Sequence, residues 1–256
     1  CLDFAHTVGY PVVVKPDNGV GANHTYKLKS DEELEFFLDT KSDEVYIMEE
    51  YVNGYVQTYD AIVDSQGQPL FESGNISPMS IMDIVNDNTD SVYYLVKDLP
   101  DKIREYGLKT VKSFGVKSRF IHLEFFVLTQ DQEGLGKAGD VLGLEVNMRP
   151  AGGYTPDMYN YSQETDVYKI WADMVCFNKN TKPIGAHHFC AFYGRRDGTH
   201  YKLDDYEIMM KYRDHMVMNG RIPDALSGAM GNQMYVATFD TQEELDQFYS
   251  DMEEKF

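Results

Sequence analysis

Residues 144–153 read Leu144-Glu145-Val146-Asn147-Met148-Arg149-Pro150-Ala151-Gly152-Gly153. Apolar and polar side chains alternate along the first six positions, which predicts a β-strand, because successive side chains of a strand point to opposite faces. The polar face then carries a carboxylate, an amide and a guanidinium, about 7 Å apart at each i, i+2 step. Carboxylate and amide oxygens suit Mg²⁺, and an arginine can clamp a phosphate or a carboxylate. The same alternation is also typical of a solvated strand face, so the interpretation depends on the rest of the chain.

Charge and composition exclude several classes of partner. The chain has 256 residues, which is enough for one large domain or two smaller ones, and its formal net charge is -19. This charge argues against nucleic acid or an anionic membrane as partner, although a nucleotide needs only one local basic pocket. No apolar run reaches transmembrane length, and no signal peptide is recognisable. The three cysteines (Cys1, Cys176 and Cys190) have no metal-type spacing, which favours a reducing, cytoplasmic location.

The beginning of the chain predicts a phosphate site. Residues 10–16 form a β-branched run that ends in Lys15 and a proline, so we expect a buried strand. Residues 17–23 follow as a loop of small residues that could bring backbone N–H groups to an anion. Lys15 is either a phosphate ligand or a terminal lysine that reaches solvent. A strand this close to a first residue that is not methionine also suggests that something precedes Cys1 in a longer protein.

Two further strands supply the case for a metal. Residues 119–129 and 141–148 are predicted strands that pair antiparallel around a polar turn, so Glu124 faces Glu145. Like charges opposite one another are destabilising unless a cation lies between them. We also predict a strand over 45–52, a hairpin of 57–64 with 69–76, a loop with one edge strand over 77–98, and a loop over 154–160. Helices are expected over 2–8, from Ser30, from Pro100 with Ile103, Tyr106, Val111 and Phe114 on its apolar side, over 166–177, within 204–216, and over 241–254.

In sequence order, these pieces resemble the ATP-grasp superfamily, which includes biotin carboxylase, carbamoyl-phosphate synthase and amino-acid ligases. The matching segments are G-Y-P-V-V-V-K-P with its Gly-rich loop, M-E-E-Y-V, H-L-E-F-F and L-E-V-N-M-R-P-A-G-G, within residues 9–153. The resemblance implies an α+β protein with the ATP-grasp fold, mostly antiparallel sheets with packed helices. It further implies a small lid subdomain over 1–54, a large subdomain with the metal site over 55–185, and a small C-terminal α/β subdomain over 186–256. The family's usual N-terminal Rossmann-like domain is not recognisable here.

The resemblance also implies a role for each matching residue. The nucleotide would be bound by Lys15, Asn18, Gly19, Gly21 and Ala22 at the phosphates, Glu49 and the backbone of Glu50, Tyr51 and Val52 at the adenine, and Gln57 at the ribose. Two Mg²⁺ ions, with Mn²⁺ as a substitute, would be held by Glu124, Glu145 and Asn147. Arg149 would be catalytic and stabilise the transferred phosphoryl group. Lys97 is a candidate for a further basic contact. His187 and His188 occupy adjacent strand positions and face opposite ways, which does not favour a ligand site.

The reaction implied is an Mg-ATP-dependent ligation of a carboxylate to an amine through an acyl phosphate. The segment Gly152-Gly153-Tyr154 resembles the loop with which amino-acid ligases approach their substrate, which favours an amino acid or another small carboxylate. One alternative is a bicarbonate-phosphorylating subunit of the carboxylase or carbamoyl-phosphate synthase kind. A second is a nucleotide-binding module without catalysis. The sequence leaves the oligomeric state open, with a homodimer as one alternative.

Overall fold

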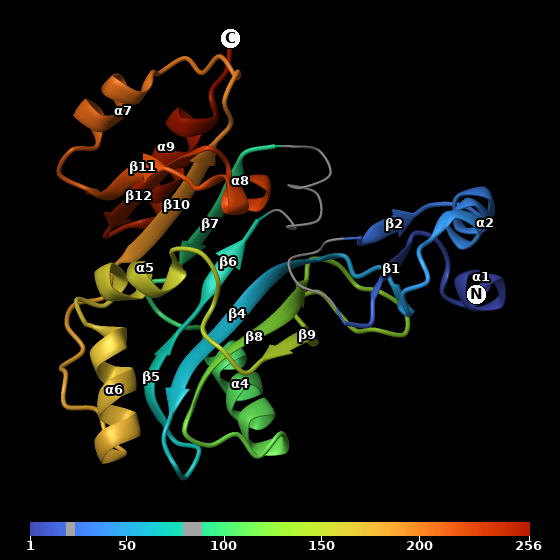
Figure 1. The fold of residues 1–256 in the computed structure, drawn as a ribbon, viewed down its shortest axis with the longest axis horizontal. Helices are drawn as coiled ribbons and strands as arrows, with labels where there is room; N and C mark the ends of the chain where they lie inside the picture. Colours follow the sequence, from blue (N-terminus) through green and yellow to red (C-terminus); the bar gives the residue numbers. More distant parts are fainter. Residues whose placement is uncertain (19–23, 79–88) are drawn as a thin grey trace.

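The computed structural model describes residues 1–18, 24–78 and 89–256, and these residues form two antiparallel sheets with helices packed against them (Figure 1). The expected α+β architecture is therefore confirmed. Three of the predicted loop residues, Gly19, Gly21 and Ala22, lie outside the described residues. No helix in the described part of the chain is long and apolar enough to cross a membrane.

The N-terminal part is a small unit with its own core. Its sheet has the order β2 (Tyr26–Leu28), β1 (Val12–Pro16), β3 (Tyr46–Glu50), and it carries α1 (Leu2–Val8) and α2 (Asp31–Thr40). Helix α2 begins as predicted, because the Ser30 side chain accepts a hydrogen bond from the Glu33 backbone N–H and the Glu33 carboxylate accepts one from Lys29 N. Buried apolar residues of the strands and helices form one cluster between them (Ala5, Val12, Val14, Leu28, Leu34 and Phe37).

The remaining described strands form a nine-stranded sheet in the order β11-β12-β10-β7-β6-β4-β8-β9, with β5 paired to β4. Their bounds are β4 (Gly54–Val63), β5 (Pro69–Ser73), β6 (Asn75–Ser77), β7 (Ser91–Leu95), β8 (Arg119–Leu128), β9 (Val141–Asn147), β10 (Phe189–Arg195), β11 (Met216–Arg221) and β12 (Gln233–Phe239). Strand β9 stands at the end of this order, and its partner among the described strands is β8.

Helices cover most of this sheet. Helix α4 (Asp101–Ser113) packs on one face of β4 and β8, where Gly107 allows close approach because a Cβ there would lie 2.2 Å from the Tyr59 ring. Helices α5 (Thr155–Ser162) and α6 (Val167–Phe177) pack against Phe71 and Phe120 in a second cluster. Helices α7 (Asp205–Lys211) and α9 (Gln242–Glu253) contribute to a third cluster with β10 and β12. The remaining short helix is α8 (Asp224–Met230).

Several local predictions are confirmed and several are wrong. The β4–β5 hairpin and the start of α9 at Thr241 are as expected. Strand β7 is not an edge strand, because β10 and β6 flank it. Residues 154–160 are not a loop, since α5 begins at Thr155. Phe114 was expected on the apolar side of the helix that follows Pro100, but it is 62% exposed. Strand β11 and helix α8 were not predicted.

The expected subdomain boundary at residue 185 falls inside one continuous sheet. Strand β10 pairs with β7 on one side and with β12 on the other, so the C-terminal strands extend the sheet that begins at β4. One apolar cluster also contains residues from both sides of this boundary, including Phe120 and Val236. The division into three subdomains remains a prediction.

Candidate functional site

A patch of polar side chains lies on one face of strands β4, β8 and β9. Two rows run across the three strands, and each row consists of residues directly opposite one another in the antiparallel ladder, so their side chains share a face. The first row is Thr58, Glu124 and Glu145, and the second row is Asp60, His122 and Asn147. We call these six residues the polar grid. It combines three carboxyl groups with an imidazole, an amide and a hydroxyl group.

A chain of hydrogen bonds fixes the buried half of the polar grid. Thr58 Oγ1 donates to Asp60 Oδ2 (2.5 Å), and Asp60 is fully buried. His122 donates from Nδ1 to Asp60 Oδ1 (2.6 Å) and from Nε2 to Glu124 Oε1 (3.0 Å). Burial by itself would lower the pKa of His122, but the charge of Asp60 and the hydrogen bonds to both carboxylates raise it to about 10. His122 is therefore charged at neutral pH and offsets one of the three carboxylates.

The exposed half of the polar grid has the properties of a cation site. Glu124 faces Glu145 as predicted, and within the described residues Glu145 has no basic partner and Glu124 contacts only His122. The Asn147 side-chain nitrogen is buried without a hydrogen-bond partner in the described part of the chain. Two opposed carboxylates, of which only Glu124 has a described polar partner, and the amide oxygen of Asn147 on the same face are the kind of oxygen ligands that Mg²⁺ takes. Among the described residues, no group of three or more His, Cys, Asp or Glu side chains could hold a metal ion.

The small sheet presents a second charged face. Val13 lies opposite both Lys27 and Glu49, so these side chains share one face with Lys15, while Val12 and Val14 point into the core beneath the helices. Lys15 Nζ contacts Glu49 Oε2 at 2.5 Å, so the predicted phosphate ligand and the predicted adenine ligand are paired with each other. Lys27 was missed, although its alternation with the buried Leu28 could have indicated it.

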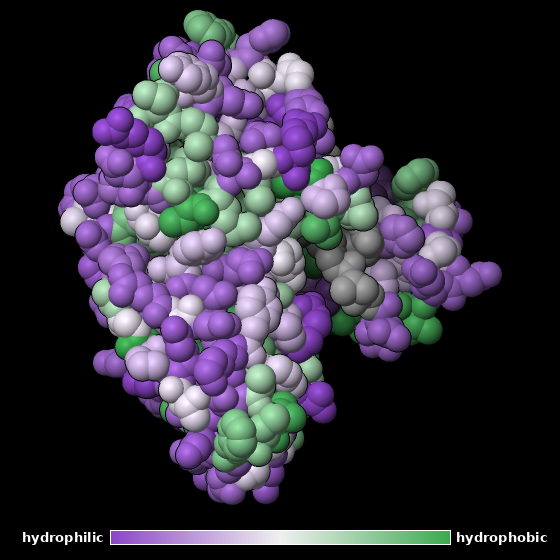
Figure 2. Space-filling view, turned by 60° about the vertical axis from the view of Figure 1, so that its left-hand side comes forward, coloured by the Kyte–Doolittle hydropathy of each residue, from purple (hydrophilic) through white to green (hydrophobic). Residues whose placement is uncertain are grey.

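The connection between the two sheets is held by one side chain from a distant turn. Gln132 Nε2 donates to Tyr51 O (2.7 Å) and to Glu50 Oε1 (3.0 Å), and Gln132 Oε1 accepts from Asn53 N (3.0 Å). Lys27 Nζ also lies 3.7 Å from the centre of the Tyr51 ring, within cation–π distance. These contacts fix the segment whose backbone was predicted to bind adenine. Figure 2 shows a recess where the small unit meets the rest of the molecule.

Comparisons with known proteins find matches to this fold among solved structures only. No protein-family model and no curated protein matches the sequence. Solved structures do match. Phosphoribosylglycinamide synthetase from Anaerococcus prevotii has a TM-score of 0.57 at 16% identity, covering 98% of this chain and 64% of the other. The L-amino acid ligase from Bacillus licheniformis has a TM-score of 0.64 at 16% identity, covering 95% and 62%. N5-carboxyaminoimidazole ribonucleotide synthetase from Thermotoga maritima has a TM-score of 0.62 at 14% identity, covering 97% and 62%.

The chain has the ATP-grasp fold. This confirms the resemblance found in the sequence, and it rests on the arrangement of the elements, because the identities are low. The chain spans less than two thirds of the length of each of these three structures.

Two residues predicted for the ATP-grasp site are not brought to the polar grid. The alternation along β4 puts Gln57 on the face of Tyr59 and Ala61, which pack in the cluster with α4, and Gln57 is only 2% exposed. The ribose role of Gln57 therefore has no support from its position. Arg149 lies two residues beyond the end of β9, is exposed and donates to Pro150 O (2.9 Å). Asn18 is exposed at the end of a described segment.

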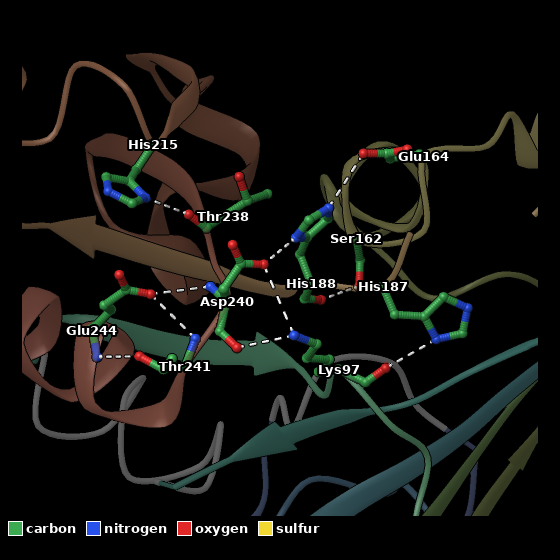
Figure 3. Close-up of polar contacts among 10 residues, drawn as sticks. All are labelled: Lys97, Ser162, Glu164, His187, His188, His215, Thr238, Asp240, Thr241 and Glu244. Atoms are coloured by element: carbon green, nitrogen blue, oxygen red, sulfur yellow. Dashed lines mark hydrogen bonds and ion pairs between the residues drawn. The ribbon is translucent and has the colours of Figure 1, made fainter. Parts of the chain in front are cut away.

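Lys97 and the two histidines belong to a different part of the ATP-grasp fold (Figure 3). Lys97 Nζ donates to Asp240 O (3.0 Å), and the His187 ring nitrogen Nδ1 lies 3.1 Å from Lys97 O. His188 contacts Asp240 Oδ1 (2.8 Å) and Glu164 Oε1 (3.3 Å), and its hydrogen bond lowers the pKa of Asp240. Both histidines precede β10, which begins at Phe189, so the prediction that they occupy strand positions is wrong, although they do contact different partners. The cluster ties the ends of β7 and β12 to the start of β10, so Lys97 has a structural explanation.

Proposed function

We propose that this chain contains the nucleotide and metal site of an Mg-ATP-dependent carboxylate–amine ligase. The observation that carries the proposal is the pair Glu124 and Glu145, opposed across β8 and β9, with the side chain of Asn147 on the same face. Such a pair raises the energy of the free protein unless a cation occupies the site. The ATP-grasp fold and its similarity to an L-amino acid ligase support the reaction class and an amino acid or small carboxylate as substrate.

Each side chain has a specific task in this proposal. Glu124, Glu145 and Asn147 hold Mg²⁺, and we propose two ions, for which Mn²⁺ could substitute. When bound, Mg²⁺ offsets the charge on the ATP phosphates. Arg149, which is exposed and has only a backbone carbonyl as partner among the described residues, can turn to the transferred phosphoryl group.

The nucleotide lies between the two sheets in this proposal, along the segment fixed by Gln132. The adenine edge is bound by the backbone of residues 50–52. Lys15 exchanges Glu49 for a phosphate oxygen, which releases Glu49 for the adenine amino group. The substrate carboxylate attacks the γ-phosphorus of ATP and displaces ADP, which gives an acyl phosphate. The amine then attacks the acyl carbon, displaces inorganic phosphate and loses a proton. The protein contributes positioning and charge neutralisation.

Calorimetric titration tests the binding step with this chain. A non-hydrolysable ATP analogue is titrated with Mg²⁺ and with a chelator, into the wild-type chain and into Glu145→Gln and Lys15→Ala. We expect binding only with Mg²⁺, and an affinity that falls at least about tenfold in Glu145→Gln, because a ligand charge is lost while the volume is kept. Equal binding with and without Mg²⁺, or an unchanged Glu145→Gln, would refute the metal site.

A turnover assay then distinguishes the substrates. ATP-dependent phosphate release with a panel of amino acids supports the ligase. Release that depends on bicarbonate alone would instead favour the phosphorylating subunit, a reading for which the similar biotin carboxylase domain from Hydrogenobacter thermophilus is a precedent. Binding without phosphate release under any of these conditions would favour a nucleotide-binding module.

A further inference from the structure

The hydrogen bonds of the polar grid leave Glu124 with only one free carboxylate oxygen. Oε1 accepts from His122 Nε2 at 3.0 Å, and the His122 ring is in turn held by Asp60 at 2.6 Å. The side chain of Glu124 is 18% exposed, that of His122 is 10% exposed, and that of Asp60 is fully buried. The ring is therefore more buried than the Glu124 carboxylate that it contacts, and the carboxylate oxygen without a partner among the described residues is Oε2.

The anchor of this arrangement lies deep in the sheet. Asp60 and His122 are opposite one another on β4 and β8, and Thr58 donates to the second oxygen of Asp60. The Thr58 hydroxyl oxygen also accepts the backbone N–H of Asn75 (2.9 Å), so the hydrogen bonds continue into β6. Neither the Asp60 carboxylate nor the His122 ring can rotate without breaking a buried hydrogen bond, which costs more than the loss of an exposed one.

Cations differ in what they require of a carboxylate. Mg²⁺ takes a near-octahedral shell with short bonds, whereas Ca²⁺ takes six to eight oxygens at longer distances and often binds a carboxylate through both oxygens. The hydrogen bond from the fixed imidazole uses one lone pair of Oε1 and holds the plane of the Glu124 carboxylate, which disfavours a bidentate contact and favours Oε2 as the oxygen offered to a cation. Groups that hydrogen-bond to a metal ligand orient it, and their loss typically weakens metal binding by about 10- to 100-fold.

We propose that Asp60 and His122 are a positioning pair that presents Glu124 to a divalent cation through Oε2 alone, so that the site selects Mg²⁺ over Ca²⁺. This inference rests on the proposed function, because it assigns a selectivity to the same site. Asp60 and His122 do not touch the cation and act through Glu124.

The test compares nucleotide binding in the two cations. The dissociation constant of a non-hydrolysable ATP analogue is measured by calorimetry in Mg²⁺ and in Ca²⁺, and the ratio is the readout. The main variant is Asp60→Asn with His122→Met, which removes the donor to Glu124 without leaving a carboxylate buried alone. Asp60→Asn alone is a milder second variant, which loosens the ring but keeps it. His122→Gln is the conservative variant, because the glutamine amide can still donate toward Glu124.

A matched control separates positioning from stability. Tyr59→Phe removes a hydrogen bond to Glu72 (2.9 Å) from the neighbouring residue of β4, on the opposite face of the sheet. This variant should melt at a lower temperature than the wild type and keep the wild-type ratio. A general loss of stability should therefore leave the ratio of the dissociation constants in Mg²⁺ and Ca²⁺ unchanged.

The expected result is a wild-type protein that binds more tightly in Mg²⁺ than in Ca²⁺ and a double variant in which the ratio falls about tenfold or more, mainly through weaker binding in Mg²⁺. Asp60→Asn should fall in between, and His122→Gln should stay near the wild type. An unchanged ratio in the folded double variant, or in Asp60→Asn if the double variant does not fold, overturns the inference and leaves the proposed function intact. A wild-type protein that binds no nucleotide in either cation overturns the proposed function itself.

Discussion

The charge on His122 should make the stability of the folded protein depend on pH. His122 lies between Asp60 and Glu124, and its pKa is raised from 6.5 to about 10. Between these two pH values the folded protein holds a proton that the unfolded chain has lost. Unfolding then releases a proton, so the free energy of unfolding falls as the pH rises, by about 1.4 kcal/mol per pH unit. The stabilisation is complete below pH 6.5 and is lost as the pH passes through the folded value.

The size of the effect follows from the same pair. A pKa raised from 6.5 to about 10 corresponds to about 5 kcal/mol of stabilisation of the charged ring. Leaving one member of a buried ion pair alone typically costs about 3–5 kcal/mol, so His122→Gln should lose stability in this range at pH 7. The double variant, Asp60→Asn with His122→Met, should lose less stability, because the carboxylate of Asp60 is then no longer buried without its cation.

Denaturant unfolding at pH 7, 8 and 9 measures both quantities. The difference in free energy of unfolding between the wild type and the double variant should shrink by about 1.4 kcal/mol per pH unit over this range. The other titrating groups are present in both proteins, so their contributions cancel in this difference. Tyr59→Phe is the control, and its profile should run parallel to that of the wild type. Parallel profiles for the wild type and the double variant would refute the charged state of His122.

Three further predictions concern the rest of the site. Glu145→Gln should raise the free energy of unfolding of the metal-free protein by about 0.2–1 kcal/mol, because it removes the repulsion from Glu124, and thermal melts with a chelator present measure this gain. Lys27→Met should weaken binding of the ATP analogue in calorimetry while Lys29→Met, at an exposed position after β2, should not; equal effects would exclude Lys27 from the site. Gln132→Ala should lower the free energy of unfolding by about 1–3 kcal/mol and speed protease cleavage within residues 50–53, because it leaves polar backbone groups of that segment without hydrogen-bond partners. Unchanged cleavage would mean that the segment is held by other contacts.

Part of the candidate site is predictable because it is local. Strands β8 and β9 follow one another in the chain and pair antiparallel, so alternation and chain order predicted that Glu145 faces Glu124, although a bulge beside Glu124 helps to set the register. Lys15 could be placed at the end of a strand for the same reason. The helix starts at Ser30 and Thr241 follow from side chains within four residues of one another.

The predictions that failed depended on distant neighbours. Strand β7 (SVYYL) has the composition of a strand, but composition does not say how many neighbours a strand has, and only its partners β10 and β6 make it an interior strand. Gln57 was assigned by its place in the motif order, and its ribose role stays a prediction, since the pleat of β4 turns it to the face that α4 shares. Residues 154–160 were read as a loop from their composition, yet the packing of Met158 and Tyr159 into the core stabilises a helix there.

The sequence by itself determined the α+β class, the order of the ATP-grasp segments, and the pair of carboxylates on neighbouring strands, because each depends on periodicity or on residues close in the chain. Only the tertiary structure decided that Asp60 lies behind His122, that Glu49 neutralises Lys15, and that Gln132 holds the connection between the sheets. These contacts join residues far apart in the chain, and no local pattern specifies which strands become neighbours. The strand order sets the surroundings of each charge, and with them the charge state of the site.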